Sequence, residues 1–244
     1  MGFSPEDTSN LSEEKPSFVT STTSTPNWPG SQSGSIYTYD SVDIGMNHVC
    51  AVTTDNTVRC WGSNDWYTLG NSSTPLWESS GVPRVVDYIG GHSEGTDLAV
   101  SIGSGGYHNC AIETDGSLKC WGNNDYGESG SNLTQQIQYP SPVMGLNNSS
   151  LIEIRAIDAG LSHTCAIVEE VPSSPVDSAA RAIGGRVACW GRNIFGQIGD
   201  NTSVDRYQAV YVVDENGNEI RNVTAISSGR NHNCALVDGN PMCW

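Results

Sequence analysis

Short alternating runs of apolar and polar residues, separated by turn residues, fill the chain from Ile36 onward. Alternation with a period of two is typical of half-buried β-strands, and turn signals between such runs favour hairpins. No stretch of useful length has a helical period. The first 35 residues differ, because Ser, Thr, Pro and acidic residues dominate them and almost no apolar period is present. We therefore predict an all-β domain over residues 36–244, preceded by a disordered tail over residues 1–35.

These runs recur as parts of a repeated unit. Four times the sequence reads His-x-Cys-Ala, beginning at His48, His108, His163 and His232, and a Cys-Trp pair follows each time. The first cysteines of successive units are 60, 55 and 69 residues apart, at positions 50, 110, 165 and 234. Such spacing fits four short strands and their turns, which make one blade of a β-propeller. The sequence therefore predicts β-propeller blades of four antiparallel strands, with about four blades present.

Hairpin geometry predicts how the eight cysteines pair. In the second unit the three-residue loop 114–116 ends with glycine, and this common closure places Cys110 opposite Cys120. In the fourth unit the loop Asp238-Gly239 is one residue shorter, and the spacing between the two cysteines is shorter by one as well. Directly opposed residues lie close enough for a disulfide. The predicted bridges are Cys50–Cys60, Cys110–Cys120, Cys165–Cys189 and Cys234–Cys243, each contributing roughly 2–3 kcal/mol.

Two segments depart from the repeat. An insertion from Glu169 to Arg186 separates Cys165 from Cys189, and we interpret it as a longer surface loop at a hairpin tip. Such a loop either binds a partner or is a neutral insertion. His92 is the only histidine outside the repeat and lies in a Gly-rich loop. It could bind a ligand, although an exposed loop histidine without a function is the simpler interpretation.

Metal binding and catalysis are the weaker interpretations of the remaining residues. A zinc ion held by His48, Cys50 and Cys60 would lack the usual fourth ligand. Calcium bound over residues 214–219 would lack the final bidentate Glu of a calcium hand, and Asn216-Gly217 favours a hairpin turn instead. The repeated histidines are predicted to satisfy the blade backbone, and no catalytic set is visible. We expect neither a metal, nor a cofactor, nor enzymatic activity.

Composition narrows the partner class and the compartment. The net charge is −16 with only 11 basic residues, which disfavours nucleic acid and anionic membranes as partners. No run approaches the ~20 apolar residues that span a bilayer, so membrane insertion is not expected. Eight cysteines in regular pairs favour an oxidising compartment, although no signal peptide is recognisable at the start of the sequence. We predict an extracellular or cell-surface protein.

The repeated motif also resembles a known family. It reads Gly-x-x-His-x-Cys-Ala, an acidic-Gly turn, then Cys-Trp-Gly-x-Asn-x-aromatic-Gly-Gln-Ile-Gly, and it resembles the regulator of chromosome condensation repeat. The stretch from Trp190 to Gly199 is nearest, and the resemblance covers about residues 36–244. It implies a propeller that usually has seven blades, so the four units would belong to a longer parent chain or close by homo-oligomerisation. The paired cysteines are similar to those of a secreted bacterial and archaeal branch. The exchange-factor activity of nuclear members depends on a loop wedge that no residue here matches.

Three functions stay open. The first is a non-catalytic scaffold that binds another protein through exposed aromatic residues on one face. The second is a carbohydrate-binding or polysaccharide-acting propeller, which requires carboxylates and aromatics that converge in one cleft. The third is a purely structural segment of a larger surface protein. The candidate binding residues are Trp66, Tyr67, Trp77, Tyr126 and Phe195, each of which could instead pack between blades, as we predict for Trp61, Trp121 and Trp190.

Overall fold

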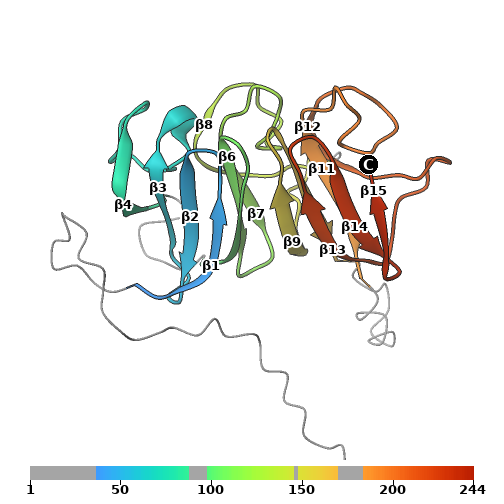
Figure 1. Ribbon diagram of the computed structural model, residues 1–244, viewed down its shortest axis with the longest axis horizontal. Helices are drawn as coiled ribbons and strands as arrows, with labels where there is room; N and C mark the ends of the chain where they lie inside the picture. Colours follow the sequence, from blue (N-terminus) through green and yellow to red (C-terminus); the bar gives the residue numbers. More distant parts are fainter. Residues whose placement is uncertain (1–36, 88–97, 146–147, 170–183) are drawn as a thin grey trace, which may run out of the picture. The chain divides into compact units, whose positions relative to one another are not determined.

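The computed structural model describes residues 37–87, 98–145, 148–169 and 184–244, which form four antiparallel β-sheets (Figure 1). The tail predicted over residues 1–35 lies outside these ranges. In the part of the chain that the structure describes, the helical element is a single 3-10 turn, η1 (Asp65–Tyr67). Within the same part, no helix has the length and apolar character needed to cross a bilayer.

Each sheet is one blade, with its strands in chain order. Blade 1 contains β1 (Tyr39–Ile44), β2 (His48–Thr53), β3 (Val58–Ser63) and β4 (Ser79–Val85). Blade 2 contains β5 (Ala99–Ser104), β6 (His108–Glu113), β7 (Leu118–Gly122) and β8 (Ile137–Pro142). Blade 3 contains β9 (Ile154–Ala159), β10 (His163–Val168), β11 (Arg186–Gly191) and β12 (Arg206–Tyr211). Blade 4 contains β13 (Val223–Ser228), β14 (Asn233–Val237) and β15 (Asn240–Cys243). The predicted all-β fold of antiparallel blades is confirmed, with three described strands instead of four in blade 4.

The hairpins have the predicted registers, and the four disulfides pair as predicted within their blades. In blade 2, Cys110 lies opposite Cys120 across a loop that ends at Gly116, whose φ is 82°. In blade 4, both loop residues have positive φ, 50° at Asp238 and 77° at Gly239, as a type I′ turn requires. The paired cysteines have Cα atoms 4.0–4.2 Å apart, because each pair is directly opposed in its ladder.

The hydrophobic core lies between the blades. Apolar side chains of facing sheets form three clusters, one for each pair of consecutive blades. Trp121 and Trp190 are fully buried in two of these interfaces, as predicted. Trp61 is only partly buried, because blade 1 has no described neighbour on that side.

The repeated histidines also lie in these interfaces, and their partners differ from the prediction. His48, His108 and His163 are buried, and burial lowers the pKa of each, so all three are neutral near pH 7. Their Nε2 atoms lie 2.8 Å from side-chain oxygens of the following blade: Asn109 Oδ1, Thr164 Oγ1 and Asn233 Oδ1 respectively. We predicted bonds to backbone within the blade, whereas the structure uses these rings to join one blade to the next.

Candidate binding surface

One end of the sheets carries the three loops that join the third and fourth strands of blades 1 to 3, and we call it the loop face. It consists of the short turns at residues 45–47, 105–107, 160–162 and 229–232 and the loops at residues 64–78, 123–136 and 192–205. Figure 1 shows the three loops together at the upper end of the sheets. Backbone bonds tie each loop to its own turn, because the amides of Ser63, Asn123 and Arg192 donate to the carbonyls of Asn47, Tyr107 and Ser162 at 2.8–2.9 Å.

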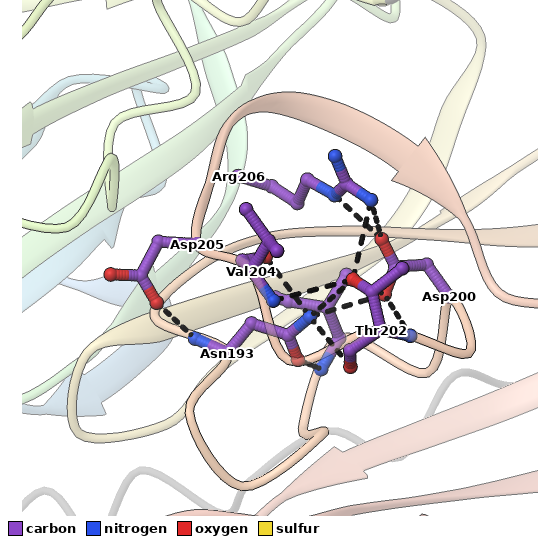
Figure 2. A network of polar contacts seen from close by, with 7 residues as sticks. Asn193, Asp200, Thr202, Val204, Asp205 and Arg206 are labelled. Carbon is purple, nitrogen blue, oxygen red and sulfur yellow. Dashed lines mark hydrogen bonds and ion pairs between the residues drawn. The ribbon is translucent and has the colours of Figure 1, made fainter.

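A buried asparagine holds each long loop in shape. In blade 3, the Nδ2 of Asn193 donates to the carbonyl oxygens of Thr202 and Val204, each at 3.1 Å, and its Oδ1 accepts the amide of Ile198 at 2.9 Å. Figure 2 shows the surrounding network, in which the Asp205 carboxylate accepts the Asn193 amide. One amide side chain therefore ties three parts of the loop together.

The same network contains a charged pair. The Nε of Arg206 donates to Asp200 Oδ2 at 2.6 Å (Figure 2). Burial opposes ionisation of Asp200, but hydrogen bonds from Thr202 and Arg206 outweigh it and hold the pKa of that carboxyl below its usual range. Both this aspartate and Asp205 are therefore already engaged in holding the loop.

Blades 1 and 2 repeat the asparagine with different partners. The Nδ2 of Asn64 donates to the Thr74 carbonyl at 2.7 Å, and the Nδ2 of Asn124 donates to the Leu133 carbonyl at 2.8 Å. Each Oδ1 accepts a backbone amide five residues ahead, at 3.0 Å. The three loops therefore start along the same path, which places the aromatic residue two positions after each asparagine at an equivalent point.

That equivalent point is occupied by Trp66, Tyr126 and Phe195, three of the predicted binding residues, and each has different surroundings. Trp66 packs edge-on against Trp77, with ring centroids 4.9 Å apart. The ring of Tyr126 is half-buried and lies 4.6 Å from the guanidinium carbon of Arg192. Phe195 is 65% exposed and Trp77 is 58% exposed. The structure thus brings Trp66 and Trp77 together and leaves Phe195 as a separate exposed ring.

Tyr67 has a backbone conformation that bulky residues disfavour. Its φ is 66°, and the corresponding residues of the next two blades are Gly127 and Gly196, with φ of 88° and 81°. Trp66 and Trp77 also have positive φ, 60° and 67°. The left-handed region costs a residue with a Cβ about 1–2 kcal/mol, and such strain concentrates at functional sites. Tyr67 was among the predicted binding residues, and a comparison of the repeats, which shows Tyr where the next two units have Gly, would also have revealed its strained backbone.

Among the described residues, six of the sixteen exposed large apolar side chains lie on the loop face. They come from one short turn and from all three loops: Met46, Trp77, Leu133, Ile194, Phe195 and Val204. The short turns surround an open cavity of about 370 Å³, lined largely by glycine and other small residues, with Arg230 at its edge. Exposed apolar side chains on positions held by a rigid frame make the loop face a candidate surface for interaction with another molecule.

The blade 2 loop of the loop face carries a carboxyl group that is buried at the interface between blades 2 and 3. Glu128 is fully buried, and its Oε2 accepts the amide of Tyr126 at 2.8 Å. Burial raises the pKa of Glu128 to about 7, and the carboxylates of Asp125 and Asp205 add to the effect. In the next unit Gln197 takes this place, with its Oε1 accepting the Phe195 amide at 2.9 Å. The chain therefore has an acid and its neutral amide at the same position of two blades.

The other candidate residues have structural roles or lie outside the described ranges. His92 and residues 170–183 of the insertion are among those that the structure does not describe. Asp214 accepts the backbone amides of Asn216 and Asn218, both at 2.8 Å, and so closes the predicted hairpin turn. All eight cysteine sulfurs are in disulfides, which removes them as zinc ligands. Among the described residues, no group of three or more His, Cys, Asp or Glu could hold a metal ion.

Comparison with known proteins agrees with this geometry. Models of the regulator of chromosome condensation (RCC1) repeat match residues 39–65, 99–128, 115–167 and 184–236. The chain is 27% identical to Protein pim1 of Schizosaccharomyces pombe over 222 residues, which cover 82% of this chain and 35% of pim1.

Two solved structures have a similar fold. Human WBSCR16 superposes with a TM-score of 0.62 at 21% identity, covering 83% of this chain and 46% of that protein. Prp20p of Saccharomyces cerevisiae superposes with a TM-score of 0.62 at 18% identity, covering 81% of this chain and 43% of Prp20p. The chain therefore spans less than half the length of each of these three proteins.

Proposed function

The chain belongs to the regulator of chromosome condensation (RCC1) repeat family, and we propose that this protein is a non-catalytic extracellular or cell-surface scaffold that binds another protein through its loop face. The observation that carries the proposal is the set of exposed apolar and aromatic side chains on loops that buried asparagines hold rigid. Large side chains presented by a rigid frame lose little conformational entropy on binding, and such anchors supply most of the energy of protein interfaces.

A similar protein supports the choice of partner class. The structure of Prp20p is described together with its binding properties to Gsp1p and histones, and a second structure has Kap60 bound to the same yeast protein. Propellers of this kind thus bind proteins. We therefore propose a protein as the partner of the loop face, and we do not transfer Gsp1p, histones or Kap60 to this chain.

The disulfides support the proposed location. Four bridges fit an oxidising compartment, because cytosolic thiols are kept reduced. Two carboxylates of the blade 3 loop favour binding over hydrolysis, because Asp200 pairs with Arg206 and Asp205 accepts the backbone amide of Asn193, so both hold the loop in shape.

Site-specific photo-crosslinking tests the proposal. We would place a photoreactive phenylalanine analogue at Trp77 or Phe195, and at Val82 of β4 as a control that is 48% exposed but lies away from the loops. We expect both loop positions to crosslink the same protein from the host cell surface, and Val82 to crosslink none. Trp77→Ala should then weaken binding of that protein at least tenfold, as loss of a central aromatic anchor does. Equal crosslinking from Val82, or binding that Trp77→Ala leaves unchanged, would refute the loop face as the site.

A further inference from the structure

The loops of blades 2 and 3 carry the same three-residue motif at the same repeat position. Asn132 and Asn201 each lie two residues after a loop glycine of positive φ, and each begins an Asn-x-Ser/Thr triplet. This triplet is the acceptor sequence for N-linked glycosylation of exported proteins. Both asparagines are exposed, and both have a left-handed backbone, with φ of 59° and 58°. The fold therefore presents two candidate modification sites with the same backbone conformation.

The backbone conformation explains the two asparagines but not the hydroxyl residues that complete the triplets. Asparagine is one of the few residues that adopt the left-handed region readily, so its recurrence needs no further cause. Thr134 and Ser203 differ, because both are exposed and lie outside the strands. Within the described ranges, neither hydroxyl makes a hydrogen bond. These two side chains therefore do not hold the loops in shape.

Burial excludes a third triplet, which begins at Asn71 in the blade 1 loop. Asn71 is 3% exposed, and its Oδ1 accepts the backbone amides of Ser73 and Thr74 at 3.1 and 2.9 Å. Its Nδ2, the atom that would carry the sugar, donates to the Leu69 carbonyl at 3.1 Å. A glycan is bulky and hydrated, so the folded chain has no room for one at this position. The blade 1 loop thus supplies an internal negative control for the motif.

Two other triplets take part in β pairing. In the triplet that begins at Asn222, the third residue, Thr224, lies within β13. In the triplet that begins at Asn148, the third residue, Ser150, forms a β-bridge with Met144. Among the described residues, the triplets of the blade 2 and blade 3 loops are the ones that are wholly exposed and outside β pairing.

We propose that Asn132 and Asn201 are acceptor sites for N-linked glycans. The transfer forms a bond between Nδ2 of the asparagine and the anomeric carbon of an oligosaccharide; the lipid-phosphate carrier of the sugar is the leaving group, and Nδ2 loses one proton. Within the described ranges, Nδ2 of Asn132 makes no hydrogen bond, whereas that of Asn201 donates to the Asp214 carbonyl at 2.8 Å. Because Nδ2 carries two protons, Asn201 can keep this bond after one proton is replaced. The inference rests on the proposed extracellular location, since the transfer acts on exported chains.

Directed secretion tests the two acceptor sites. The full chain, preceded by a secretion signal, is expressed in a eukaryotic host that attaches N-linked glycans. Peptide N-glycosidase in heavy-oxygen water then converts each glycosylated asparagine to labelled aspartate, which mass spectrometry maps, and a sample without the enzyme corrects for spontaneous deamidation. We expect label at Asn132 and Asn201 in most of the secreted chains and at Asn71 in none.

Matched substitutions separate recognition of the triplet from folding. Thr134→Ala should remove the label at Asn132 and leave Asn201 labelled, whereas Thr134→Ser should keep both labels because it keeps the hydroxyl. Since Thr134 is exposed and its hydroxyl makes no hydrogen bond within the described ranges, both variants should form all four disulfides and keep the stability of the parent chain.

Three results would overturn the proposal, each measured on chains in which all four disulfides have formed, whether secreted or retained. They are the absence of label at Asn132 or Asn201, label at Asn132 that persists in Thr134→Ala, and label at the buried Asn71. The proposed location fails by a different result, which is reduced cysteines in protein taken from its own host. Directed secretion decides the acceptor sites whichever way that result falls.

Discussion

The same loops contribute to the interface between blades 2 and 3 and to the loop face. Two of the interface residues are the same in each repeat unit, whereas the loop-face residues differ from unit to unit. In the interface, the histidine and the tryptophan recur from unit to unit, because each contacts the neighbouring blade at every junction. On the loop face, the position two residues after the buried asparagine carries Trp66, Tyr126 and Phe195, with three different environments. Repetition therefore marks what joins the blades, and divergence within one frame marks where a partner can be distinguished.

The largest expected effect is a difference in how much one substitution in each region lowers the free energy of unfolding. Trp190→Ala removes a fully buried ring and the bond from its indole to the Glu128 carbonyl, so it should lower the free energy of unfolding by about 3–5 kcal/mol. Phe195→Ala removes a ring that is 65% exposed, and the change should stay within about 0.5 kcal/mol. Urea denaturation followed by circular dichroism measures both.

The two substitutions should affect binding in the opposite order from stability. Phe195→Ala should weaken the partner crosslinked from the loop face, whereas Trp190→Ala should not do so under conditions where the chain is folded. A large loss of stability from Phe195→Ala would mean that this ring belongs to the frame and that the two regions are not separate.

The second effect is a pH dependence confined to the interface. The pKa of Glu128 is raised to about 7 from 4.5, so the folded state holds a proton that the unfolded state has lost between those values. Its contribution to stability is therefore full below about pH 4.5 and is lost as the pH rises to 7. Glu128→Gln, which copies Gln197 of the next unit, should stabilise the chain at pH 8 by about 1–3 kcal/mol.

His108 provides the opposite slope in the same interface. Burial, with smaller contributions from His163 and His48, lowers its pKa to about 3 from 6.5, so its contribution is full above about pH 6.5 and is lost as the pH falls toward 3. Between pH 4.5 and 6.5, rising pH lowers the free energy of unfolding through Glu128 and raises it through His108. The two contributions therefore partly cancel in that range. In Glu128→Gln only the contribution of His108 remains of these two. The free energy of unfolding, measured by urea denaturation, should then fall steadily from pH 7 to pH 4. A gain that persists at pH 4 would contradict the assignment to Glu128.

Local contacts explain how much of this molecule the sequence could predict. The disulfide pairs follow from hairpin loops of two or three residues, where register is a matter of counting, and Asn216-Gly217 makes its turn for the same reason. The burial of Trp121 and Trp190 could be predicted because one repeat implies one environment. These contacts need no knowledge of how the blades lie side by side.

The contacts between blades could not be predicted in this way. His48 meets Asn109 at a separation of 61 residues and His163 meets Asn233 at a separation of 70, and only the packing of consecutive sheets defines those pairs. The contact between Trp66 and Trp77 depends on a loop path that the Asn64 bonds determine. The signal at Tyr67 was present in the sequence as a departure from Gly127 and Gly196, and it becomes visible only when units are compared with each other.

The smallest expected effect is at Tyr67, where one substitution should increase stability and weaken binding. Its φ of 66° suits glycine better than tyrosine, so Tyr67→Gly should raise the free energy of unfolding by about 1 kcal/mol. The reciprocal Gly196→Tyr should lower it by a similar amount, since φ is 81° there and a Cβ meets no atom within 4 Å, which leaves backbone strain as the cause. If Tyr67 contributes to the binding surface, Tyr67→Gly should bind the crosslinked partner more weakly although it is more stable, the trade-off expected of a strained functional residue. Thermal unfolding and a binding titration on the same samples distinguish this from a tyrosine without a role, for which stability would rise and affinity would stay unchanged.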